Sequence, residues 1–166
     1  MKKIALIPAL LAFSFIQAQQ AFSGKGDQKL SIGLNTQNGG NAIQISYDLG
    51  LGDNISYGFV SSYILGFDAI GEGSKPDFKD RIDAKIRFNA NLGNVFELDP
   101  KMDIYPGLDL GLRNFGAHLG FRYFFSEGFG IFTEAGIPIA SYKTNPIGFD
   151  KLNNQFTFNI GASFNL

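Results

Sequence analysis

His118 is the residue in this chain best suited to acid–base or nucleophilic chemistry, and it is the only histidine. One imidazole in a chain without cysteine makes a poor metal site, because protein metal sites need several such ligands. Glu134 could orient His118, but a carboxylate and an imidazole without a nucleophile do not make an esterase. We therefore expect a structural histidine that is hydrogen-bonded to Glu134 or Asp109.

Paired carboxylates are the second candidate, since one can act as general acid while the other acts as general base. Asp83 and Asp109 qualify by type. However, Arg87, Arg113 and Arg122 occur on the same or neighbouring segments. Opposite charges in close proximity favour structural ion pairing, so we expect pairing at these carboxylates instead of catalysis.

Three glycine-rich or acid-rich segments could in principle bind phosphate or metal. SEGFG (126–130) and GLGDN (50–54) lack the lysine and the following helix of a phosphate-binding loop, so they predict turns. DAIGEGSKPDFKD (68–80) lacks the regular ligand spacing of a calcium loop and predicts a long solvated loop. Its acidic residues are Asp68, Glu72, Asp77 and Asp80.

The candidate residues lie on segments in which apolar side chains recur at every second position, which is the periodicity of a β-strand. In RIDAKIRFNANLG (81–93), every second residue from Ile82 to Leu92 is apolar and the residues between them are polar or charged. Asn38-Gly39-Gly40 predicts a hairpin turn, and we expect Pro106 at the start of its strand. Eight such runs are present, at 30–35, 43–49, 55–67, 82–92, 106–113, 116–125, 131–139 and 156–166.

Size decides which face of the strands lies inside. Eight antiparallel strands could form a sandwich, a barrel with an apolar lumen, or a membrane barrel with its apolar face outward. The interior of an eight-stranded barrel is only just wide enough for side chains, and the bulky face of a chain with 18 Phe would overfill it. We therefore predict an all-β, antiparallel, up-and-down transmembrane barrel with small and charged residues inside. The expected interior network of four acids, four bases and one histidine comprises Asp48, Asp83, Lys85, Arg87, Asp109, Arg113, His118, Arg122 and Glu134.

The first 18 residues predict a cleaved signal peptide. Lys2 and Lys3 precede an apolar run from Ile4 to Ile16, and the small residue Ala18 follows. Residues 19–166 are then a single barrel domain, because a chain of this length seldom forms two domains. The net charge of −1 gives no basic footprint, so we expect no nucleic-acid partner.

The connections alternate between the two sides of the predicted membrane. With both chain ends in the periplasm, strand parity places loops 68–80 and 143–154 outside the cell and connections 50–54, 93–103 and 126–130 in the periplasm. Long outer loops and short inner turns are the general rule for such barrels. The connection 93–103 is long for the periplasmic side.

The segments RFNANLGNVF, MDIYPGLDLGLRNFG, GFRYFFSEGFG and NQFTFNIGASFNL resemble small outer-membrane barrels of Gram-negative bacteria and, among them, an uncharacterised barrel family of Bacteroidota. The resemblance implies a monomer among outer-membrane lipid and lipopolysaccharide, which the barrel-assembly machinery inserts. It also implies that the alternating last strand is the assembly signal. The residues that match this signal are Phe158, Ile160, Phe164 and Leu166.

The same resemblance bears on enzymatic activity. Some eight-stranded outer-membrane barrels are lipid A deacylases, which use a histidine and a serine two residues later on one strand. Position 120 of this chain is glycine, so that nucleophile is missing after His118. We expect a non-enzymatic barrel without cofactor or metal, which stabilises the envelope or displays loops for binding or adhesion. The alternatives are a narrow pore for small solutes or ions and a lipid-modifying enzyme.

Overall fold

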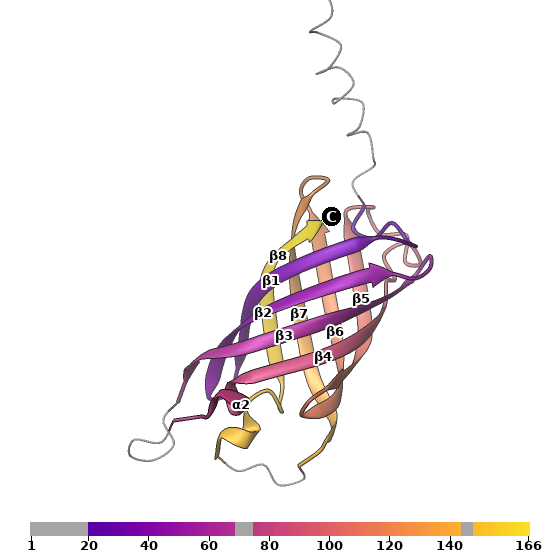
Figure 1. Cartoon of the computed structure of the whole chain (residues 1–166). Helices are drawn as coiled ribbons and strands as arrows, with labels where there is room; N and C mark the ends of the chain where they lie inside the picture. The colour runs from indigo at the N-terminus through magenta and orange to yellow at the C-terminus, as the bar shows by residue number, and fades with distance from the viewer. Residues whose placement is uncertain (1–19, 69–74, 144–147) are drawn as a thin grey trace, which may run out of the picture.

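The protein forms a closed barrel of eight antiparallel strands, as the alternation predicts (Figure 1). The computed structural model describes residues 20–68, 75–143 and 148–166, so the predicted signal peptide lies outside the described residues. Each strand pairs with the next along the chain, and the last strand pairs with the first to close the cylinder. The strands are β1 (Gln28–Gln37), β2 (Gly40–Gly50), β3 (Ile55–Phe67), β4 (Ile82–Ala90), β5 (Met102–Gly111), β6 (Asn114–Phe124), β7 (Phe129–Ser141) and β8 (Thr157–Asn165).

The connections divide between two ends of the barrel. One end, called here the termini end, holds both ends of the described chain and the links β2–β3, β4–β5 and β6–β7 (Figure 1). The other, the loop end, holds the helical turns α2 (Phe78–Arg81) and η1 (Gly148–Lys151). The predicted hairpin turn also lies there, with Gly39 at a φ of 79° that glycine adopts without strain. In the described part of the chain, neither helical turn nor any other helix is long and apolar enough to cross a bilayer.

The bulky side chains point away from the barrel axis and the charged ones point toward it. Phe121, Phe158 and Ile86 are 40%, 42% and 44% exposed, whereas Arg87 and Asp83 are 2% and 1% exposed. The alternation of the two faces follows from the pleat of the strand, which turns successive side chains to opposite sides. The interior is therefore polar, and the apolar surface is the outer wall.

β5 corrects the prediction for Pro106. This strand begins at Met102, so the proline lies in its middle and not at its start. β5 pairs with β6 from Met102 onward, but its ladder with β4 stops at the pair Asn89 and Gly107. Because a proline offers no N–H to a second neighbour, it fits where one ladder has ended. The first half of β5 consequently belongs to the barrel, and the connection runs over residues 91–101, two residues earlier than the predicted 93–103 and equally long.

β3 contains residues that interrupt the simple alternation of its sequence. Val60 and Ile64 face the interior, with exposures of 7% and 0%. A register irregularity between β2 and β3 beside Ala42 leaves Leu65, which faces outward, without a partner on β2. Ile64 and Ala42 pack with Leu152 in a small apolar cluster at the loop end. Outside this cluster, the buried apolar side chains of the strands include Phe124 and Phe132, with exposures of 0% and 3%.

Candidate functional site

Arg87 is the centre of the interior charge cluster. Its guanidinium donates to Asp48 Oδ1 at 2.7 Å, to Glu134 Oε2 at 2.9 Å and to Ser46 Oγ at 3.1 Å. These partners come from β2 and β7, so one side chain of β4 joins three strands across the lumen. Breaking such a buried ion pair from one side typically costs about 3–5 kcal/mol, because it leaves uncompensated charge.

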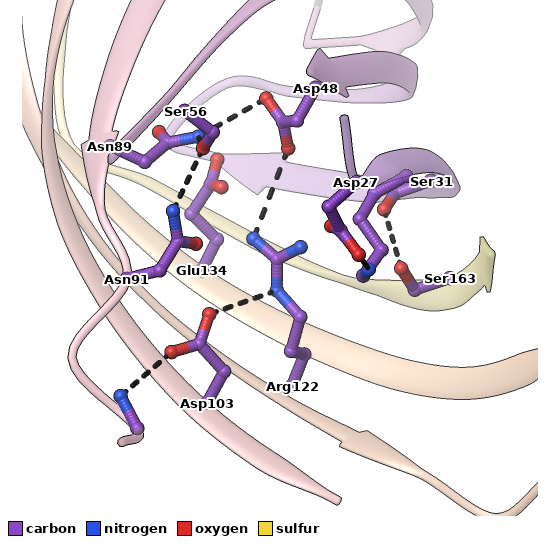
Figure 2. Close-up of polar contacts among 12 residues, drawn as sticks. Asp27, Ser31, Asp48, Ser56, Asn89, Asn91, Asp103, Arg122, Glu134 and Ser163 are labelled. Carbon is purple, nitrogen blue, oxygen red and sulfur yellow. Dashed lines mark hydrogen bonds and ion pairs between the residues drawn. The ribbon is translucent and has the colours of Figure 1, made fainter. Parts of the chain in front are cut away.

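Arg122 forms the second cationic position and lies between Asp48 and Asp103 (Figure 2). Its guanidinium lies 3.9 Å from Asp48 Oδ2 and 3.7 Å from Asp103 Oδ2, which are ionic contacts beyond hydrogen-bond length. The same group lies 3.9 Å from the ring centroid of Tyr105. Gly120 makes room for that ring, since a Cβ there would lie 2.0 Å from the Tyr105 Cζ. The missing side chain at position 120 therefore serves packing.

His118 has an acceptor at each ring nitrogen. Nδ1 lies 3.0 Å from Asp109 Oδ2, and Nε2 lies 2.9 Å from Asn89 Oδ1. The Asn89 amide nitrogen donates to Asp48 and to Ser56, which turns the amide oxygen toward the imidazole. Glu134, the other predicted partner, bonds to Arg87 instead. Each ring nitrogen therefore faces a polar partner within hydrogen-bond distance, and neither faces the hydroxyl of a nucleophile.

Lys29 is an interior residue that the sequence analysis missed. Its side chain is 1% exposed, pairs with Asp27 and lies 5.6 Å from the centroid of the Phe124 ring. Lys29 has the same parity as Ser31, whose hydroxyl bonds to Ser163 at 3.0 Å across the closing seam (Figure 2). Extending the first alternating run by one residue toward the N-terminus would have included it.

Asp103 and Tyr105 were missed for a related reason. The predicted strand began at Pro106, but both residues continue the inward parity of Asp109. Tyr105 is 2% exposed, and Asp103 accepts a hydrogen bond from the backbone N–H of Gly93 at 3.0 Å. Residues 103, 105, 107 and 109 alternate in the sequence as one inward face. The predicted strand omitted the first two of them because Pro106 was expected at its start.

Arg113 does not lie in the central cluster. It belongs to the link between β5 and β6, where its guanidinium donates to the Lys79 carbonyl oxygen and lies 3.7 Å from Asp80. Lys85 faces inward but is 21% exposed, and its Nζ is 3.8 Å from Asp83. The structure thus brings together Asp48, Arg87, Asp109, His118, Arg122 and Glu134, and places Asp83, Lys85 and Arg113 toward the loop end.

A segment after η1 enters the barrel mouth at the loop end. Leu152, Asn153 and Asn154 are all buried. The Asn153 N–H donates to Gln37 Oε1 at 2.6 Å, and the Asn114 amide donates to Asn153 O at 2.9 Å and to Asn154 Oδ1 at 3.0 Å. We call residues 152–154 the plug. It has no strand periodicity, and the sequence analysis treated it as part of a polar loop.

The termini end is covered by the chain that precedes β1. Ala21 is 0% exposed and donates its N–H to the Pro100 carbonyl at 2.7 Å. Gly26 N–H donates to the Gly50 carbonyl at 2.9 Å. This stretch therefore packs against the links of its own end.

A cavity of about 520 Å³ lies beside the plug at the loop end, and Asn154 of the plug is part of its lining. We call it the loop-end cavity. Its lining combines three cations, two carboxylates and three apolar or aromatic side chains. The lining residues are Lys79, Asp80, Ile82, Leu112, Arg113, Tyr142, Lys143, Asp150 and Asn154.

The acidic loop 68–80 gives no support to a metal site in its described part. Within residues 20–68, 75–143 and 148–166, no three His, Cys, Asp or Glu side chains are grouped as metal ligands would be. Asp77 and Asp80 lie near Lys79 and Arg113 respectively, at 3.5 and 3.7 Å. Glu72 lies outside the described residues.

The last strand places its apolar side chains on the outer wall. Phe158, Ile160 and Leu166 are 42%, 53% and 69% exposed. Phe164 contacts Phe129 with ring centroids 5.7 Å apart. β8 pairs with both β7 and β1, so the C-terminal segment is bound in the sheet.

Comparison with known proteins identifies a family and a fold. The model of a family described as "Family of unknown function (DUF6646)" matches residues 12–166. A solved structure described as "De novo design of transmembrane beta-barrels" is similar with a TM-score of 0.57 at 10% sequence identity, over 87% of this chain and 98% of that one. No curated protein matches.

Proposed function

For this chain, which belongs to the family of unknown function DUF6646, we propose the role of a non-enzymatic outer-membrane barrel with a filled interior. It stabilises the envelope or presents its loops for binding at the surface of a Gram-negative bacterium. Residues 1–18 direct its export, and the barrel-assembly machinery inserts it as a monomer through the C-terminal strand.

One observation carries the membrane location. The outward positions of all eight strands hold no Asp, Glu, Lys or Arg, while every charged residue inside the strand bounds has inward parity. In water, an outer wall of exposed Ile, Leu and Phe would be a large apolar patch that promotes association. In a bilayer the same wall is solvated, and the closed sheet leaves no unpaired strand edge.

The contents of the lumen support a role that does not depend on transport. Large, fully buried side chains occur along the length of the barrel interior. They run from Ile64 at the loop end through Arg87 and Arg122 to Lys29. The plug covers one mouth. An eight-stranded interior has little volume beyond its side chains, so an ion path is not expected.

Fractionation tests this proposal. We expect the full-length protein, expressed in a Gram-negative host, to co-sediment with outer membranes and to migrate faster on gels when it is not boiled. Recovery in the soluble fraction, with mobility that does not depend on heating, would contradict it. A variant truncated before β8 is the matched control, because without the closing strand it should lose both properties.

A further inference from the structure

We propose that the loop-end cavity binds the phosphate-bearing headgroup of a lipid from the leaflet that surrounds this end of the barrel. The inference rests on the proposed membrane location, and it names a ligand class for a site to which the proposed function assigns none.

The cavity lies at the border between the apolar wall and the polar loops. Ile82 begins β4 and Leu112 follows β5, and both belong to the outer wall where it ends at the loop end. Leu112 and Tyr142 are 66% and 56% exposed. Apolar and aromatic side chains at this level lie where acyl chains give way to headgroups.

The neighbouring helical turn α2 has the composition of an interfacial segment. Phe78 is 67% exposed and lies 6.0 Å from Tyr63, measured between ring centroids. Arg81 places its guanidinium 4.6 Å from the Tyr63 ring and donates to the Ile64 carbonyl at 2.9 Å. An exposed phenylalanine beside cations, resting on the barrel wall, is typical of chain that lies in a membrane interface. α2 supplies Lys79 and Asp80 to the cavity.

The charges favour an anion. Lys79, Arg113 and Lys143 line the cavity against Asp80 and Asp150, which leaves one net positive charge. The side chain of Arg113 is only 15% exposed and is held in place by Asp80 and the Lys79 carbonyl. A guanidinium fixed in this way is suited to a phosphate, because its donors match the spacing of phosphate oxygens.

Lys143 is the second phosphate contact. It is 65% exposed and donates to Asp150 at 2.7 Å, a hydrogen bond that lowers the pKa of this carboxyl below its ordinary value. Exposed pairs of this kind contribute little stability, so a phosphate can replace the carboxylate at the lysine. The cavity volume of about 520 Å³ lies within the usual range of about 300–1,000 Å³ for small-molecule sites. The apolar lining then leads the acyl chains back to the barrel wall.

The test uses the refolded full-length barrel in detergent micelles with lipid A, in its phosphorylated and its enzymatically dephosphorylated form. Native mass spectrometry measures the fraction of protein that retains each lipid. We expect preferential retention of the phosphorylated form. Lys143→Ala and Arg113→Gln should each reduce this retention by about 3- to 10-fold, the effect of losing one partly exposed charge contact.

Asp150→Asn is the decisive variant, because it releases Lys143 and adds one net positive charge to the cavity. It should increase retention of the phosphorylated lipid, an effect that damage to the fold would not produce. Lys151→Ala is the matched control: this lysine is exposed on η1 but does not line the cavity, so retention should not change.

Three outcomes would overturn the inference: equal retention of both lipid forms, an unchanged or weaker signal for Asp150→Asn, or complete displacement of the lipid by excess inorganic phosphate. The last would identify a site for free anions. If the protein refolds into a heat-modifiable barrel and these results follow, the lipid site fails while the proposed function stands. If no heat-modifiable barrel forms, the proposed function itself fails.

Discussion

Replacing Arg87 by methionine tests whether the interior network stabilises the barrel. The change keeps a long side chain but leaves Asp48 and Glu134 buried without the hydrogen bonds of 2.7 and 2.9 Å that they accept from the guanidinium. The nearest remaining cation to Asp48 is Arg122, at 3.9 Å. We expect the free energy of unfolding to fall by about 3–5 kcal/mol, as for other buried pairs broken from one side.

Urea unfolding in detergent micelles, followed by far-UV circular dichroism because the chain has no tryptophan, measures this loss. With an m value of about 2 kcal/mol per molar urea, a loss of about 4 kcal/mol moves the midpoint by about 2 M. Lys85→Met is the matched control on the same strand. Its ammonium is partly exposed and 3.8 Å from its carboxylate, so its removal should cost about 1 kcal/mol or less.

A triple variant separates lost pairing from lost packing. Arg87→Met combined with Asp48→Asn and Glu134→Gln removes the stranded charges and should recover most of the stability, because neutral amides need no counter-ion. If the triple variant is as unstable as Arg87→Met alone, the effect is steric. If Arg87→Met itself matches the wild type, the network does not contribute and the reasoning is refuted.

Three further predictions concern packing, the outer wall and the loops. Gly120→Ala should lower the free energy of unfolding by about 1–3 kcal/mol in the same urea assay, since its Cβ would lie 2.0 Å from Tyr105 Cζ. Gly128→Ala, with nothing within 4 Å, should behave as wild type, and equal effects at both glycines would contradict the packing described. Leu119→Arg, on the outer wall, should destabilise the barrel in lipid vesicles by about 2–4 kcal/mol, whereas a neutral result would argue against contact with hydrocarbon. The hydrogen bond from Lys143 lowers the folded-state pKa of Asp150. The contribution of this pair to folding stability is therefore present above the ordinary carboxyl pKa and is lost as the pH falls through the lowered value. Lys143→Ala should therefore raise the Asp150 pKa in an NMR titration, and an unchanged pKa would exclude the pairing.

Strand alternation predicted most of the architecture, because a pleated strand fixes the side on which every second residue lies. Arg87, His118 and Glu134 could be assigned to the interior in this way without knowing their partners. Their partners depend on the relative stagger of strands that are distant in sequence. A choice between Glu134 and Asp109 as the partner of His118 therefore needed the structure.

Irregular chain was predicted less well. Pro106 suggested a strand start, but its missing N–H matters only on the side where the ladder with β4 has already ended. The predicted strand extended to Arg113, which lies two residues beyond the end of β5, in a link where the backbone turns and strand parity no longer applies. The backbone of Asn153 in the plug is hydrogen-bonded to the side-chain amides of Gln37 and Asn114. Strand periodicity in the sequence does not predict such contacts.

The most direct test of the account is the current through a planar bilayer that contains the refolded, heat-modifiable barrel. Because buried side chains fill the lumen and residues 152–154 cover one mouth, we predict insertion without steady single-channel conductance. Reproducible open-channel currents from the wild-type protein would contradict a filled interior and favour a pore.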